Sequence, residues 1–402
     1  MSLRTHSFHL MKPSTSAPPF AIFFPLAALD AFIVGGGWIC ALRESPVSRA
    51  IADIAAWHRR ELLFGYVVAV LAGFLLTALP RWTGLALPKG AVPTVLCAWI
   101  AARFAPTYPS PLAPLALAPA MGLVLIAAFH IWRARDWRNA KTALLLALFT
   151  LAGSASLSGF ALPWREFAMK VAISAMVSLI MVVGGRVLPA LTARFDELGG
   201  VPAVTRRRRA LEPVSAVLAF AGLGFWLFTP EGAPSAILLL GAGAGQAGRM
   251  ASWFRRRAFA SPSLIALYAA YASIPVGFGL LALHALAPNA APASAGLHVW
   301  TIGGFGGMSL AIKASMIRKR CDLAFTPSRA AETAVALCLG AAAARVSAAF
   351  SAEPSIFLYV SAMAWSAGFA LFLFAFRAPV VEAAFRRPRE ARRRNPRTEI
   401  RR

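Results

Sequence analysis

The sequence of 402 residues is poor in acidic residues, with 16 Asp and Glu against 41 Lys and Arg, and only 14% of it is charged. Soluble domains contain roughly 25% charged residues, so this composition excludes an ordinary soluble protein. The shortage of polar residues likewise excludes intrinsic disorder. The four cysteines are scattered and form no CxxC pair, so they indicate neither a disulfide framework nor a zinc site.

Hydrophobic residues make up 58% of the chain, while the formal net charge is +25. A basic excess of this size suggests either a nucleic-acid-binding surface or a membrane protein whose charges lie in its loops. A membrane-spanning helix needs about 20 mostly apolar residues. The sequence contains twelve such segments, at 20–42, 62–80, 90–107, 111–132, 142–163, 171–190, 211–229, 233–253, 262–287, 297–317, 330–351 and 355–376.

We therefore expect an all-α, polytopic membrane protein with about twelve transmembrane helices and no nucleic-acid partner. No segment alternates with a period of two residues, which argues against a membrane β-barrel. Most basic residues fall into the loops that are cytoplasmic if the N-terminus is inside, so both termini are predicted to be cytoplasmic. This divides the chain into a cytoplasmic segment (1–19), a transmembrane domain (20–376) and a basic cytoplasmic tail (377–402).

The letters GAGQAG at 243–248 match the dinucleotide-binding pattern GxGxxG. They lie inside an apolar helix with no strand before it, so the phosphate-binding geometry is not expected. Small residues at such spacing let a neighbouring helix approach closely. We interpret the glycines as packing sites, and extend this interpretation to Gly184, Gly185 and the glycines at 303–307.

Two of the six histidines, His58 and His298, are predicted to open transmembrane segments at the outer surface. Two imidazoles at one depth on different helices are what a haem or metal site in a helical bundle requires. The alternative is that both histidines merely lie among the lipid headgroups.

The neighbours of each histidine allow two interpretations. Glu61 lies one helical turn from His58, where its carboxylate would orient the imidazole, or it is simply solvated at the interface. Thr301 lies one turn from His298, and Gly303 and Gly304 would admit either a bulky planar ligand or a packed helix.

Asp30 is predicted in the middle of the first span, where ionisable groups are costly. It would serve a proton path or pair with a basic residue inside a span. The candidates are Arg103, Arg186, Lys313 and Arg345.

Three stretches resemble the signatures of the NnrS family. The first reads WHRRELLFGY at 57–66, continued by AGFLLTALPRWTG at 72–84. The second reads GGRVLPALT at 184–192, and the third HVWTIGGFGGM at 298–308. The resemblance implies a twelve-span protein that binds haem and copper in the bacterial inner membrane and responds to nitric oxide and nitrosative stress.

The carried-over site residues are His58 and His298 as metal ligands, with Glu61 and Arg186 as matching polar positions. The chain departs from the family at two places, because Arg60 and the stretch KRCD at 319–322, which includes Arg320, stand where the family has histidines. Arginine stays protonated and does not ligate metals. The alternatives to a full haem and copper complement are one haem held by His58 and His298 or no metal.

The expected function is a haem-binding, and in the family's pattern also copper-binding, protein of the nitric oxide response. Its partners would be the lipid bilayer and nitric oxide or a related small ligand, while the redox partner is not indicated. The alternatives are a secondary transporter or channel for a small solute or ion, and a membrane sensor without catalysis.

Overall fold

The computed structural model describes residues 17–49, 51, 53–106, 110–198, 208–320 and 328–385. Every regular element within these ranges is helical, as the composition predicts. The predicted segment 1–19 and the tail 377–402 fall largely outside the described residues. The first half of the bundle contains α1 (Pro19–Leu42), α2 (Pro46–Arg49), α3 (Ile54–Arg60), η1 (Glu61–Tyr66), α4 (Val67–Thr83), α5 (Ala91–Ala102), η2 (Ala113–Leu117), α6 (Ala118–Ala134), η3 (Trp137–Asn139), α7 (Ala140–Leu157) and α8 (Leu162–Leu198).

The second half contains α9 (Arg208–Phe228), α10 (Ala233–Trp253), η4 (Arg256–Ala260), α11 (Pro262–Leu286), α12 (Ala293–His298), η5 (Val299–Gly307), α13 (Met308–Arg320), α14 (Arg329–Phe350) and α15 (Pro354–Phe385). The elements η1 and η5 are π-helical, and each continues the helix before it directly into the helix after it. A π-helical segment widens the turn and changes which side chains share a face.

Nine helices within the described residues are long and apolar enough to cross a membrane. Three predicted spans fall short of this measure. The helix α5 has only 12 residues, while α10 and α12–η5–α13 contain polar and charged residues such as Gln246, Arg249 and Lys313 as well as several glycines. The multi-pass character is therefore confirmed, while the number twelve stays a prediction. Many large apolar side chains on the outside of the bundle are exposed, among them Trp132, Trp164 and Phe228, as expected of a surface that faces lipid.

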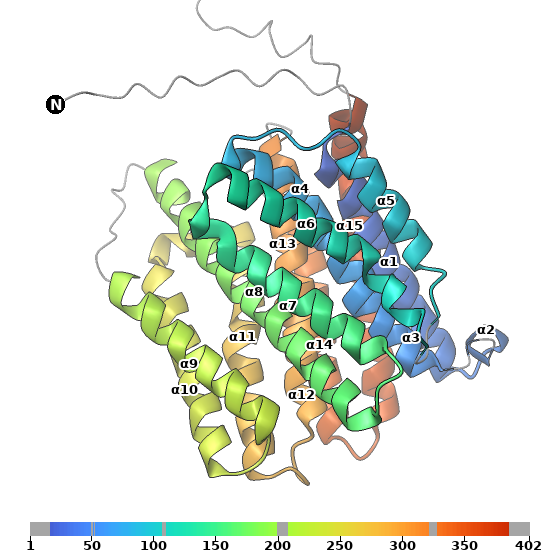
Figure 1. The fold of residues 1–402 in the computed structure, drawn as a ribbon. Helices are drawn as coiled ribbons and strands as arrows, with labels where there is room; N and C mark the ends of the chain where they lie inside the picture. Colours follow the sequence, from blue (N-terminus) through green and yellow to red (C-terminus); the bar gives the residue numbers. More distant parts are fainter. Residues whose placement is uncertain are drawn as a thin grey trace, which may run out of the picture.

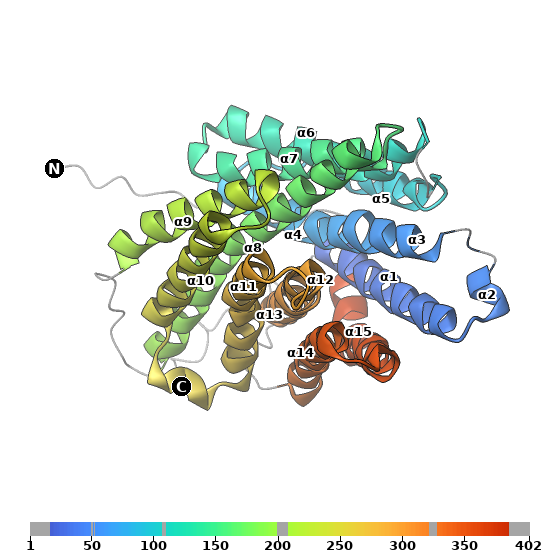
Figure 2. The ribbon, with the colours of Figure 1, turned by 90° about the horizontal axis from the view of Figure 1, so that it is seen from below.

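The helices stand roughly side by side in a bundle whose two halves are joined through α1 and α15 (Figure 1). Viewed from below, α5, α6 and α7 lie along one edge, α9 and α10 along another, and α14 and α15 along a third (Figure 2). The element α12 lies near the middle of this view, and it contacts α11 and α14. Residues far apart in the sequence therefore meet around α12.

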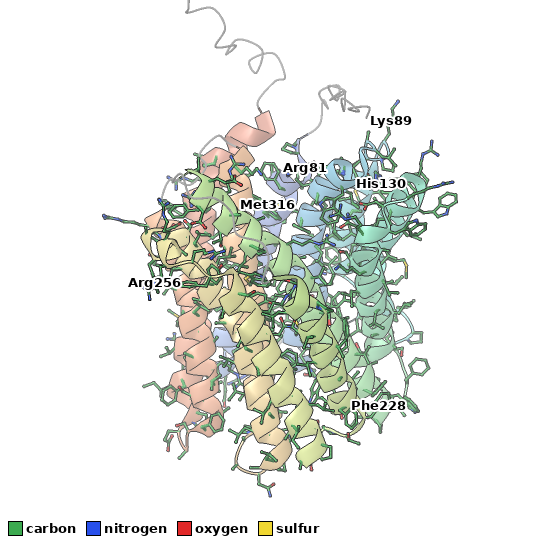
Figure 3. All side chains as sticks on the ribbon, turned by 90° about the vertical axis from the view of Figure 1, so that its left-hand side faces the viewer. Arg81, Lys89, His130, Phe228, Arg256 and Met316 are labelled. Carbon is green, nitrogen blue, oxygen red and sulfur yellow. The ribbon has the colours of Figure 1, made fainter. Side chains whose placement is uncertain are left out.

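The start of α1 and the end of α15 lie at the same end of the bundle (Figure 1). Arg81, Lys89 and His130 gather near one end, and Phe228 lies near the opposite end (Figure 3). If the start of α1 and the end of α15 lie on the same side of the membrane, the chain between them crosses the membrane an even number of times. Which side of the membrane this end faces stays a prediction from the distribution of basic residues.

The glycines of the stretch GAGQAG at 243–248, which matches the dinucleotide-binding pattern by letter only, lie inside α10, as predicted. A Cβ on Gly243 would lie 3.2 Å from the backbone oxygen of Pro275, and one on Gly245 would lie 3.3 Å from Ser215. A Cβ on Gly184 would approach the ring of Tyr271 to 2.6 Å. The packing interpretation of these glycines is thus confirmed for the three positions, because each admits a neighbouring helix at close range.

Candidate functional site

A cavity of about 320 Å³, called the main cavity below because both candidate ligands meet there, is lined by His58 and His298. Its walls come from α1, α3, η1, α4, α8, α12, η5, α14 and α15, so it forms only when the two halves of the chain pack together. Most of the lining is apolar, including Leu62, Met176 and Phe305. A volume in this range is typical of small-molecule sites, which span about 300–1,000 Å³.

Each histidine stands at the same structural landmark, just before a π-helical segment. His58 belongs to the last turn of α3 and precedes η1 by three residues, and His298 is the last residue of α12 before η5. Such segments occur frequently at functional sites. Tyr66 on η1 also lines the cavity, and its hydroxyl hydrogen-bonds to that of Ser309, the first residue after the third motif. The ring of Tyr66 lies 5.6 Å from that of Phe305, so the first and third motifs are in contact.

The imidazole of His298 is oriented by the backbone of its own helix. Its Nδ1 lies 2.7 Å from the carbonyl oxygen of Ser294, a contact in which Nδ1–H donates. This hydrogen bond fixes the tautomer and leaves the lone pair on Nε2 available. Ligating histidines are usually held by such a bond from the second ring nitrogen. Thr301, which was predicted one turn from His298, also lines the cavity.

The imidazole of His58 is oriented by an aromatic neighbour. Its ring centroid lies 4.7 Å from that of Trp38 on α1, with the two planes tilted by 42°. Nδ1 of His58 is buried and has no hydrogen-bond partner among the residues that the structure describes. A buried nitrogen without a partner is unusual enough to require an explanation, and a ligand in the adjoining cavity would supply one.

Glu61 points away from His58 in the structure. Its carboxylate forms ion pairs with Arg60 and Arg103, and it is only 4% exposed. Glu61 is therefore neither solvated at the interface nor hydrogen-bonded to the imidazole. The arginines that pair with Glu61 lie close to the end of the short helix α5. The guanidinium of Arg60 also donates hydrogen bonds there, to the carbonyl oxygens of Arg103 and Ala105.

Arg60 thus satisfies carbonyl groups that the C-terminal end of α5 leaves without helical partners. It does not line the main cavity. The family histidine that Arg60 replaces corresponds, in this fold, to a position facing α5 rather than the two candidate ligands. Arg320 is the last residue of α13, and residues 321–327 lie outside the described part of the chain.

Asp30 is buried beside the same cluster, with Oδ2 3.7 Å from Nη1 of Arg103. This is the ion-pair arrangement, with Arg103 as the partner among the four basic residues considered. Lys313 lies elsewhere, in a smaller cavity of about 60 Å³, with Nζ about 5 Å from three aromatic ring centroids. The rings belong to Tyr66, Phe369 and Phe372.

Arg186 lies in a separate polar cluster outside the main cavity. Its guanidinium donates to Asn139 and, over 3.1 Å, to the carbonyl oxygen of Arg138, and it lies 5.7 Å from the ring of Trp82. Trp82 belongs to the second part of the first motif, so this part meets the second motif here. The structure places Arg186 in a contact between helices and does not bring it to His58 and His298.

Three lining residues with a role in this site were not singled out as site residues from the sequence: Trp38, Arg59 and Arg345. Trp38 gave no signal, because an aromatic residue in an apolar span is ordinary. Arg345 was noted only as a partner for Asp30, although a basic residue inside a span is itself an indication of function. It lines the main cavity from α14.

The chemistry available in the cavity is that of two imidazoles in apolar surroundings with two nearby guanidinium groups. Within the described residues, no group of three or more His, Cys, Asp and Glu side chains is arranged to hold a metal ion. The main cavity therefore offers two imidazole nitrogens, fewer than the three or four protein ligands that a bare metal ion usually needs.

Comparison with known proteins supplies one match. Neither a curated protein nor a solved structure matches the chain. The family model described as NnrS protein matches residues 15–383, which is nearly the whole chain. The resemblance noted in the three motifs is therefore confirmed, and the protein is a member of the NnrS family.

Proposed function

We propose that the protein binds one haem through His58 and His298 and acts in the bacterial response to nitric oxide or nitrosative stress. The observation that carries the proposal is that these two histidines, from separate family motifs, line one apolar cavity. Membership of the NnrS family supports the connection with nitric oxide.

The residues present fit a haem on three counts. The walls are apolar, as the macrocycle requires, and they include Met169, Ile173 and Leu358. His298 has its Nδ1 engaged with Ser294 and its Nε2 available. His58 has a buried nitrogen without a partner. When bound, the haem would supply an iron, whose chemistry includes the binding of diatomic molecules such as nitric oxide.

The cavity residues have distinct tasks in this proposal. The imidazoles hold the iron, Trp38 fixes the plane of the His58 ring, and the apolar walls exclude water. A separate copper centre has no ligand set among the described residues. We therefore assign both histidines to one haem, and copper remains a property of the family that metal analysis must test here.

The proposed location is the bacterial inner membrane, with both termini in the cytoplasm and the lipid bilayer as the surrounding partner. His58 and His298 would then lie toward the outer side, because α3 and α12 begin at the end opposite to the start of α1. The small ligand would enter from that side.

The test is the absorption spectrum of the full-length protein, purified in mild detergent from haem-replete cells. We expect a Soret band, a positive pyridine haemochrome assay and about one iron per chain. His58→Ala and His298→Ala should each reduce the haem content strongly. His284→Ala is the matched control, because His284 contacts the carbonyl oxygen of Ala291 and does not line the cavity.

A colourless, metal-free protein would contradict the proposal and favour the alternative, a transporter or channel. The observation that favours this alternative is the short helix α5, whose end meets the buried charges of Arg60, Glu61, Arg103 and Asp30. Interrupted helices with intramembrane charges are common at transporter binding sites. In this cluster, however, the charges pair with one another.

A further inference from the structure

The main cavity is cationic and has no acidic lining residue within the described part of the chain. Apart from Tyr66, its ionisable lining residues are the two histidines, Arg59 and Arg345. Both guanidinium groups therefore share the cavity with the two imidazoles. The cavity therefore favours a ligand that carries negative charge as well as apolar surface.

Arg345 differs from the other arginines of the bundle interior. It is partly buried in α14 and has no hydrogen-bond or ion-pair partner among the residues that the structure describes. Four other arginines pair with carboxylates: Arg60 and Arg103 with Glu61, Arg249 with Glu212, and Arg318 with Glu332. An intramembrane arginine is costly and is normally paired. Arg345 is thus an arginine without a protein partner, among the described residues, that lines the main cavity.

We infer that Arg345, assisted by Arg59, binds the carboxylate groups of the planar apolar ligand that occupies this cavity. This inference rests on the proposed function, since a haem carries two carboxylate side chains on an apolar ring. A guanidinium presents parallel N–H donors that match a carboxylate bidentately. Arg345 is half-buried and is the main anchor, while Arg59 is exposed at the rim and contributes less.

The anchor is separate from the metal ligands, so it can be tested without iron. Protein is purified in full length from haem-deficient cells and titrated with metal-free protoporphyrin IX and with its dimethyl ester. Binding is followed by porphyrin fluorescence in the same detergent. The ester has the same ring but no negative charge, and neither porphyrin offers an iron to the histidines.

We expect the wild-type protein to bind the acid more tightly than the ester by on the order of tenfold, since a hydrogen bond to a charged group is stronger than one to a neutral group. Arg345→Gln should remove most of this preference and leave ester binding unchanged. Arg345→Lys should retain part of it, because the charge remains without the bidentate fork. Arg59→Gln should have a smaller effect.

Two controls separate charge recognition from folding and from ligation. Arg43→Gln changes an exposed arginine at the C-terminal cap of α1, outside the cavity, and should leave both affinities unchanged. The double variant His58→Ala, His298→Ala should keep the preference for the acid, since no metal is present. Thermal unfolding of each variant checks that it is folded.

The outcomes distinguish this inference from the proposed function. If neither porphyrin binds the wild-type protein, the haem proposal and the role of Arg345 both fall. If the acid and the ester bind equally well to wild type, or if Arg345→Gln retains the full preference for the acid, only the role of Arg345 is overturned. Preference for the acid that disappears in Arg345→Gln supports it.

Discussion

The indole of Trp38 packs against the imidazole of His58, with ring centroids 4.7 Å apart. Because Nδ1 of His58 has no hydrogen-bond partner among the described residues, this contact is the main restraint seen on the orientation of the ring. His298, by contrast, is oriented by the carbonyl oxygen of Ser294. The two candidate ligands are therefore positioned by different means, one of which can be removed by a side-chain substitution.

Trp38→Ala should weaken haem retention by about tenfold, the lower end of the range found when groups that orient metal ligands are removed. The measurement is the rate of haem transfer to apomyoglobin, together with the shape of the Soret band. Trp132→Ala, at a site that is 68% exposed, is the matched control and should behave as wild type. An unchanged rate in Trp38→Ala would show that His58 needs no aromatic support.

Glu61→Gln should destabilise the fold without shifting the haem spectrum. The substitution leaves Arg60 and Arg103 without their shared carboxylate, and removing one partner of a buried ion pair costs about 3–5 kcal/mol. The free energy of unfolding in a detergent titration measures the loss. Glu353→Gln, at an exposed site, should change it by less than about 0.5 kcal/mol. A shifted haem spectrum in Glu61→Gln would instead indicate that Glu61 orients His58.

Gly185→Ala should destabilise the contact between α8 and α10. The added Cβ would overlap the guanidinium of Arg249, which lies 2.7 Å from Glu212 and 3.2 Å from Tyr271. Overpacking of this kind costs about 1–3 kcal/mol. Gly340→Ala places a methyl in open space inside α14 and should be neutral or mildly stabilising. Equal melting temperatures for the two variants would argue against this close approach.

Arg186→Gln should lower stability while leaving haem content intact. The substitution removes the hydrogen bond to Asn139 and the contact with the ring of Trp82, together about 1–2 kcal/mol. Thermal unfolding and the pyridine haemochrome assay are measured on the same preparation. Arg133→Gln, an exposed change at the end of α6, serves as the control. Loss of haem in Arg186→Gln alone would make Arg186 part of the cofactor site.

The predicted orientation can be tested with introduced cysteines in a background whose native cysteines are replaced by serine. Glu231→Cys lies in the turn between α9 and α10, and Lys89→Cys in the turn before α5; both sites are exposed. A membrane-impermeant maleimide should label Glu231→Cys in cells with a permeabilised outer membrane, and Lys89→Cys only after lysis. The reverse pattern would place the N-terminus outside.

Several features of the fold follow from the sequence by simple physics. An apolar run long enough to cross a bilayer must be helical there, because the lipid offers no partners to backbone polar groups. The helices therefore lie close to the predicted segments. The π-helical segments η1 and η5 and the early end of α5 did not follow, since they depend on contacts between helices. The end of α5, for example, is completed by Arg60 from α3.

The sequence by itself determined that the protein is a membrane bundle and that His58 and His298 are its candidate ligands. It did so because composition fixes the solvent in which the helices are stable, and because histidine is rare in the spans and chemically distinctive. Only the tertiary structure decided what surrounds those ligands. Glu61 is one helical turn from His58 but forms ion pairs with Arg60 and Arg103. Trp38 from α1 and Arg345 from α14, in contrast, line the cavity beside the histidines. The physical reason is that side-chain partners are chosen across helix interfaces by charge and packing, which the spacing along one helix does not record.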